Sequence, residues 1–169
     1  MNKAFKLVFQ TVNTILVSLV VILVILLVGL KFVGLTPYTV ISGSMEPKYH
    51  VGSLIYVTKV SDPETLTVGT PVTYMREVTT ITHQIVEKGT DEKGLYFVTK
   101  GLREESIPDP KIYPENILGK PVFSIPYLGY LSNYIQNPPG TYIVIALCAL
   151  LVILCFLPEL LFPQEGKDN

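Results

Sequence analysis

The sequence predicts a mainly β protein, in which a small coiled β-sheet or partial barrel is flanked by N- and C-terminal transmembrane helices. Three observations lead to this prediction. Long apolar stretches stand near both ends of the 169-residue chain, and 49% of all residues are hydrophobic. Short β-branched and aromatic runs lie between them, separated by glycine and proline turns. The intervening length suits one modest domain of about a hundred residues.

The first apolar stretch, residues 12–30, is long enough for a helix that crosses a bilayer, which needs about 20 residues. Residues 31–37 contain no Ala-x-Ala cleavage site, so we expect a retained anchor and not a cleaved signal peptide. Two lysines precede the stretch and one follows it closely. This bias predicts a cytoplasmic N-terminus and an extracytoplasmic middle segment.

The second apolar stretch, residues 142–157, contains no charged side chain. It is slightly short for a span, so a tilted or interfacial helix is the alternative to a second crossing. A second crossing would make the chain a multi-pass membrane protein and return the tail, residues 164–169, to the cytoplasm. Cys148 and Cys155 lie too far apart along one helix to form a disulfide, and we expect both to face lipid or packing neighbours.

The middle of the chain, residues 36–137, is expected to be the β domain, between an anchor over residues 1–35 and a C-terminal helix and tail over residues 138–169. Strands are predicted over residues 38–41, 53–58, 71–75, 79–87, 95–99 and 117–124. A turn over residues 88–91 would join the fourth and fifth runs as a hairpin. Short strands at regular spacing favour a small coiled sheet or partial barrel.

Composition and charge argue against two classes of function. The net charge is −1 and no basic stripe is present, so a nucleic-acid partner is not expected. No histidine, cysteine or carboxylate cluster has metal-ligand spacing, so we expect no zinc site.

A tight turn follows the first predicted strand, with the sequence Ser42-Gly43-Ser44-Met45-Glu46-Pro47. Ser44 is a candidate nucleophile, although a serine in a Gly/Pro turn is more often a hydrogen-bonding turn residue. Ser42 can place its hydroxyl on the same side, where it would act with the main-chain N–H of Ser44 as an oxyanion donor.

His83 lies inside the predicted strand 79–87. A lone histidine in a strand is more often structural, but the imidazole group suits a general base near neutral pH. His50, in a polar loop, is expected to be exposed. A serine, a histidine and an acid on separate elements together make a hydrolytic site, because the histidine removes the proton that keeps serine a poor nucleophile.

The segment Ser42–Pro47 resembles the nucleophile motif of type I signal peptidases. The resemblance continues in order through residues 52–55, 68–74, 82–83, 99–101 and 119–122, over about a hundred residues. A histidine at position 83, where the bacterial housekeeping branch has lysine, is typical of the branch shared by the endoplasmic reticulum enzyme, archaea and some sporulating Gram-positive bacteria. The resemblance implies Ser44 as nucleophile, His83 as general base, Ser42 as oxyanion donor, and no cofactor.

The sequence departs from the family pattern at the acidic residues that accompany the histidine. Members of this branch usually have Lys-Gly-Asp and then a second aspartate that orients the histidine, whereas Leu102 replaces the first aspartate here. Asp109 is the best match to the second, and a plain Pro-Asp-Pro turn is its alternative reading. Glu104 and Glu105 are fallback partners for His83.

The function implied by the resemblance is a membrane-bound serine endopeptidase that removes N-terminal signal peptides from secreted precursors at the outer membrane surface. The precursor would add as an extended strand along residues 36–41. Met45 and Ile41 would form shallow pockets for its small residues, although Met45 can equally fill the core. The expected partners are precursor proteins and the lipid bilayer; the sequence leaves open whether the chain works as a monomer or inside a complex.

Two other functions remain open at this point. Leu102 suggests a catalytically impaired homologue that binds precursors, such as pilins, and assists their assembly. A purely structural β domain on a membrane anchor is the other, and the two serines of the turn argue against it.

Overall fold

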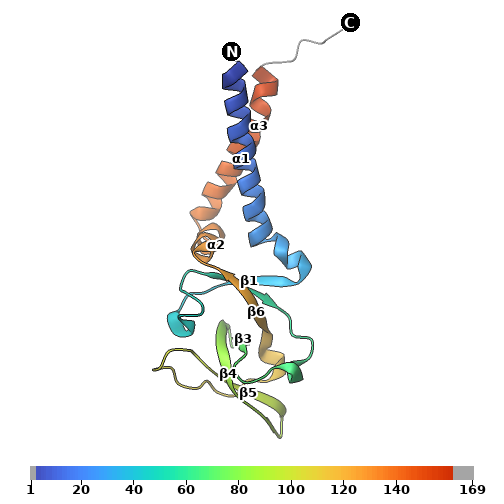
Figure 1. Cartoon of the computed structure of the whole chain (residues 1–169), viewed down its shortest axis with the longest axis vertical. Helices are drawn as coiled ribbons and strands as arrows, with labels where there is room; N and C mark the ends of the chain where they lie inside the picture. The colour runs from blue at the N-terminus through green and yellow to red at the C-terminus, as the bar shows by residue number, and fades with distance from the viewer. Residues whose placement is uncertain (1–2, 162–169) are drawn as a thin grey trace. The chain divides into compact units, whose positions relative to one another are not determined.

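The computed structural model describes residues 3–161, and the side chains of residues 7–9, 11–150 and 153. The chain divides into two units, one that carries the β-sheet, Val28–Asn133, and one made of the helical segments before and after it (Figure 1). The predicted tail over residues 164–169 and the side chain of Cys155 lie outside the described residues.

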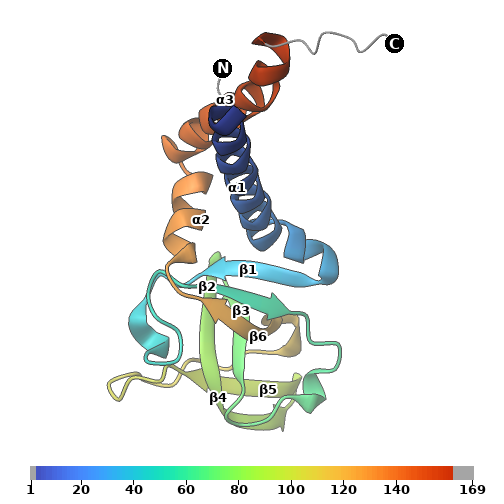
Figure 2. The same cartoon turned by 45° about the horizontal axis from the view of Figure 1, so that its top comes forward.

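The predicted fold class is confirmed, since six antiparallel strands form one sheet in the order β1-β2-β6-β3-β4-β5. Figure 2 shows β1 and β2 running crosswise to β4, so the sheet is strongly coiled. Irregular register between β2 and β6, β3 and β6, and β4 and β5 adds to this bending. The strands are β1 (Leu35–Thr39), β2 (Leu54–Thr58), β3 (Pro71–Arg76), β4 (Thr79–Asp91), β5 (Gly94–Lys100) and β6 (Ile117–Ile125).

The hairpin of β4 and β5 is longer than the sequence predicted. Residues 88–91 belong to β4, and the turn consists of the two residues between the paired Asp91 and Gly94. The predicted turn was therefore wrong. Gly89, which suggested it, lies opposite Tyr96, where an added Cβ would come within 2.6 Å of the ring. This glycine serves cross-strand packing and not chain reversal.

Two other boundaries also differ from the prediction. The first strand begins and ends earlier than residues 38–41, although hydrogen bonds of Val40 with Ser53 and Gly52 continue the pairing. A helix, α2 (Leu128–Gln136), ends the segment that was predicted as β. Its Gly129 lies against the two residues that precede β2, where its N–H donates to the Gly52 carbonyl at 2.9 Å and an added Cβ would collide with the Ser53 carbonyl oxygen. This close approach is possible only for glycine.

Two buried clusters support the sheet. The larger cluster lies among β3, β4 and β5, and the smaller one lies beneath the turn that follows β1. Burial of each large apolar side chain contributes about 1.5–3 kcal/mol, so both regions are well fixed. The larger cluster contains Leu66, Val72, Tyr74, Ile85, Phe97 and Ile112, and the smaller contains Met45, Tyr49, Ile55 and Val57.

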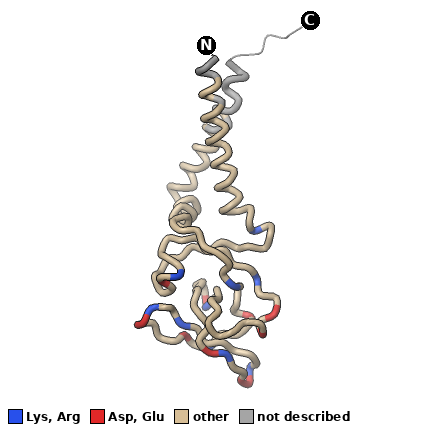
Figure 3. The backbone as a smooth tube through the Cα atoms, viewed as in Figure 1, with Lys and Arg blue, Asp and Glu red and all other residues tan. Residues whose placement is uncertain are grey.

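The helical unit contains α1 (Lys3–Leu27) and α3 (Gly140–Leu161). Within the described residues one segment, Leu7–Leu27, is long and apolar enough to cross a membrane, and the apolar segment Gly140–Leu150 is shorter. Figure 3 shows that charged residues gather in the sheet unit, and residues 7–27 of α1 and 140–150 of α3 include no charged residue. A membrane association agrees with this pattern, and the second crossing stays a prediction.

Candidate active site

Ser44 lies in a single 3-10 turn, Gly43–Met45, that follows the extended backbone of Ser42. The N–H of Glu46 donates to the Gly43 carbonyl at 3.1 Å, which closes the turn. Met45, only 2% exposed, fastens the turn to the smaller apolar cluster. The turn is therefore anchored below, while Ser44 remains half-buried with its hydroxyl available.

Residues 101 and 102 hold the turn from a second side. The N–H of Leu102 donates to the Ser44 carbonyl at 2.7 Å, and the Leu102 side chain packs against the cluster of Met45. Gly101 passes so close that an added Cβ would lie 2.7 Å from the Ser44 carbonyl oxygen. The leucine that departs from the family pattern thus occupies an apolar packing position beside the nucleophile turn.

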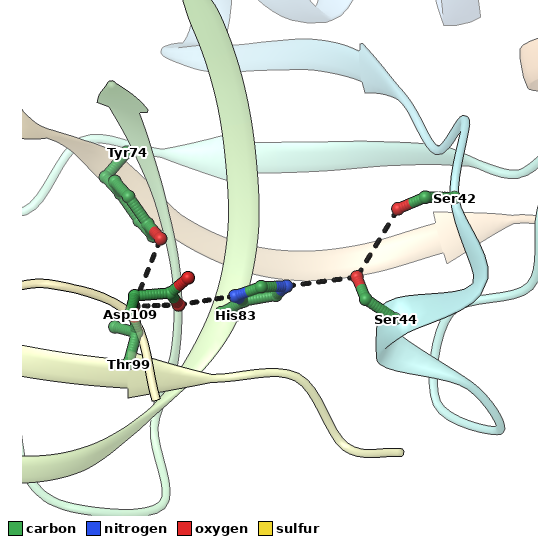
Figure 4. A network of polar contacts seen from close by, with 6 residues as sticks. All are labelled: Ser42, Ser44, Tyr74, His83, Thr99 and Asp109. Atoms are coloured by element: carbon green, nitrogen blue, oxygen red, sulfur yellow. Dashed lines mark hydrogen bonds and ion pairs between the residues drawn. The ribbon is translucent and has the colours of Figure 1, made fainter. Parts of the chain in front are cut away.

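His83 lies on β4, opposite Val72 of β3. Because side chains alternate along a strand, His83 shares a face with Ile81 and Ile85, both part of the larger cluster or packed against it. Its Nε2 atom lies 3.1 Å from the Ser44 Oγ atom (Figure 4). The predicted nucleophile and base are therefore within hydrogen-bonding distance, although they lie 39 positions apart in the sequence.

Asp109 lies on the opposite side of the imidazole, with its Oδ2 atom 2.6 Å from His83 Nδ1. Both side chains are 14% exposed. The main-chain N–H of Asp109 donates to the Thr99 carbonyl at 2.7 Å, which fastens the Pro-Asp-Pro segment to β5. The two fallback acids, Glu104 and Glu105, are exposed, and Glu105 lies 3.6 Å from Arg103.

These contacts define the tautomer of His83. A carboxylate can only accept hydrogen bonds, so the ring hydrogen sits on Nδ1 and is donated to Asp109. Nε2 then presents its lone pair to the hydroxyl of Ser44. An imidazole held in this way can remove the proton of a serine and be stabilised by the carboxylate when it becomes charged.

Two residues of this network were not predicted from the sequence. Thr99 donates to Asp109 Oδ2 at 2.8 Å, and its Oγ1 lies 3.2 Å from the hydroxyl of Tyr74. Burial raises the pKa of Tyr74 to about 12, and the negative charge of Asp109 adds to the rise. The alternation of side chains along the strands could have placed both residues on the core face, since Thr99 pairs with Ile85 and Tyr74 pairs with Ile81 there.

An open groove with a volume of about 430 Å³ passes Ser44. Ser42 borders it, and its Oγ lies 3.4 Å from that of Ser44. Ile41 is 78% exposed, whereas Met45 lines the groove and also belongs to the core cluster. The lining consists of residues 38–42 and 79–83 together with Ser44, Met45, Tyr49 and Ile55.

His50 is exposed, as expected. Within the part of the chain that the structure describes, no group of three histidine, cysteine, aspartate or glutamate side chains is placed to hold a metal ion. Ser44 and His83 line the groove, and Asp109 contacts the His83 ring from outside this lining.

Comparison with known proteins agrees with the resemblance that the motifs indicated. No family model matches the chain. Signal peptidase I W of Bacillus subtilis (strain 168) is 32% identical to it over 120 residues, which are 66% of this chain and 63% of the relative. The match therefore spans less than two thirds of that protein's length. By this similarity the chain is a homologue of signal peptidase I W.

Proposed function

We propose that the chain is a membrane-bound serine endopeptidase that removes N-terminal signal peptides from secreted precursors at the outer membrane surface. The observation that carries the proposal is the line of contacts from Ser44 through His83 to Asp109, at 3.1 and 2.6 Å. Such distances are those expected of a nucleophile, its base and the group that orients the base. The relative named signal peptidase I W and the apolar segment of α1 support it.

The proposed reaction is acyl transfer. Ser44 Oγ attacks the scissile carbonyl carbon while its proton passes to His83 Nε2, and Asp109 stabilises the resulting imidazolium. The negative charge that develops on the carbonyl oxygen is met by the Ser44 N–H and the Ser42 hydroxyl. The C–N bond then breaks, and His83 gives its proton to the leaving amine of the mature protein. Water repeats the steps on the acyl-enzyme and releases the signal peptide.

The precursor is proposed to bind as an extended strand along the end of β1. Val40 uses its main-chain groups toward β2, since its N–H donates to Ser53 and its carbonyl accepts from Gly52, both at 2.9 Å. Because these groups alternate in direction, those of Thr39 and Ile41 point to the opposite edge. In the described sheet β1 is an edge strand, so this edge can pair with a precursor and align its scissile carbonyl with Ser44.

The remaining parts of the proposal concern the membrane. The N-terminus is cytoplasmic, the sheet unit is extracytoplasmic, α3 makes a second crossing, and precursors and lipid are the partners of the chain. A cysteine introduced at Thr90, in a chain without its two native cysteines, should react with an impermeant reagent outside intact cells. A cysteine at Gly166 should not react, and labelling there would contradict the second crossing.

The experiment that tests the activity is cleavage of precursors with small residues before the cut by the purified chain in detergent. We expect Ser44→Ala, His83→Ala and Asp109→Ala to lose cleavage and Glu105→Ala, an exposed acid of the same loop, to keep it. A wild-type chain that cleaves none of these precursors would overturn the proposal.

That outcome would favour the impaired homologue that binds precursors. Leu102 was the feature that suggested it. Leu102 packs in the apolar cluster while Asp109 lies against His83, so we do not favour this alternative.

A further inference from the structure

The acid of the proposed site is held by one residue at two points. Asp109 Oδ2 accepts from the Thr99 hydroxyl at 2.8 Å, and the Asp109 N–H donates to the Thr99 carbonyl at 2.7 Å (Figure 4). The same Oδ2 atom lies 2.6 Å from His83 Nδ1. Thr99 therefore fixes both the backbone and the carboxylate of Asp109 relative to the imidazole.

Thr99 is itself held by burial and by strand pairing. It is fully buried on β5, and its partner across the ladder is Ile85, two residues after His83 on β4. The base and the residue that holds the acid thus belong to one hairpin. The geometry between His83 and Asp109 is set by the pairing of two adjacent strands and not by a loop alone.

Tyr74 lies beside the same hydroxyl and the same carboxylate. The single hydroxyl hydrogen of Thr99 is directed toward Asp109 Oδ2, at 2.8 Å, and toward the Tyr74 hydroxyl, at 3.2 Å. The Tyr74 hydroxyl in turn makes a hydrogen bond with the side chain of Asp109. Tyr74 keeps its proton at all ordinary pH values, because burial raises its pKa to about 12. Two buried hydroxyl groups therefore support the carboxylate of Asp109.

We propose that Thr99 is a positioning residue for the peptidase reaction, which holds Asp109 against His83, and that Tyr74 supports the same carboxylate. This inference rests on the function proposed above. Neither residue belongs to the lining of the groove, so their contribution is to turnover and not to precursor binding.

The test compares the cleavage kinetics of Thr99→Val, Thr99→Ser and Tyr74→Phe. Removal of a hydrogen bond to a charged group predicts that Thr99→Val lowers kcat by about 10- to 100-fold with KM nearly unchanged. Thr99→Ser keeps the hydroxyl and should restore most of kcat. Tyr74→Phe should lower kcat less, because Thr99 can still donate. Thr99→Ala replaces Thr99→Val if the valine variant does not fold.

A matched control is Thr73→Val. Thr73 is also fully buried in the sheet, and its hydroxyl bonds to a hydroxyl of the adjacent strand, that of Thr82, at 2.9 Å. It should lose stability as Thr99→Val does and keep kcat. A further readout is Thr99→Val in an Asp109→Asn background, where a residue that acts through Asp109 should have no additional effect on kcat.

Three outcomes would overturn the inference. One is a kcat of Thr99→Val within about twofold of wild type, where loss of a bond to a charged group should cost far more. Another is a Thr99→Ser variant as slow as Thr99→Val. The third is an equal loss in Thr73→Val. Failure of the wild-type chain to cleave would instead overturn the proposed function, and this inference with it.

Discussion

Replacement of Gly101 by alanine tests how tightly the nucleophile turn is held. The added Cβ would lie 2.7 Å from the Ser44 carbonyl oxygen and 3.2 Å from the Ser44 Cβ. Ordinary contact begins at 3.4 Å, so the two segments must separate by about 0.7 Å, the difference between 3.4 and 2.7 Å. The Leu102 N–H bond to the same carbonyl, now 2.7 Å long, would lengthen to near the limit of a hydrogen bond.

The consequence for Ser44 follows from the tolerance of catalysis to displacement. A misplacement of about 1 Å costs about 100-fold in rate, so a shift of this size predicts a loss of roughly 10- to 100-fold in kcat. Overpacking of this kind also lowers the free energy of unfolding by about 1–3 kcal/mol. Both quantities are measurable, by precursor cleavage in detergent and by thermal unfolding.

Two further variants separate displacement of Ser44 from general destabilisation. Gly119→Ala places a Cβ against the main-chain carbonyl of Thr58, between β6 and β2, and should lose stability while it keeps kcat. In a Gly101→Ala chain the added Cβ would also lie 2.7 Å from the Ser106 Oγ atom, and Ser106→Ala removes this contact. The double variant should not regain activity, since the added Cβ still collides with the Ser44 carbonyl. A Gly101→Ala chain with wild-type kcat would refute the reasoning.

Three other predictions concern the site and its surroundings. Asp109→Asn should lower kcat by about 10⁴-fold, because the amide favours the wrong tautomer of His83; a loss below tenfold would contradict this role. Leu102→Asp should lower both melting temperature and activity, because a carboxylate enters the apolar cluster. A gain in activity would contradict this prediction and show that the aspartate of the family pattern improves catalysis in this chain too. The pKa of Tyr74, raised to about 12, favours the neutral folded form. The contribution of neutral Tyr74 to the free energy of unfolding is therefore full below the ordinary pKa of about 10 and is lost as the pH rises toward 12. The free energy of unfolding of Tyr74→Phe should consequently depend less on pH between about 10 and 12 than that of the wild-type chain.

The sequence by itself determined the strands and the apolar segment of α1, but not α2, and it singled out two residues of the proposed site. Strand alternation and turn residues are local signals, so the strands were found with small boundary errors, and the apolar stretch of α1 was evident from length alone. Ser44 and His83 stood out through the ordered motifs that resemble type I signal peptidases, since each residue taken alone has a more common structural role. Asp109, in a Pro-Asp-Pro segment, carried no such local signal.

Only the tertiary structure decided which acid meets His83, and how it is held. Asp109 follows His83 by 26 positions, across a hairpin whose turn was predicted too early because of the glycine at position 89. The hydrogen bonds of Thr99 depend on the register of that hairpin, and those of Leu102 depend on close approach at Gly101. Sequence patterns encode the direction of each side chain within its own strand, whereas distances of a few ångströms between strands arise from the coiling and pairing of the whole sheet.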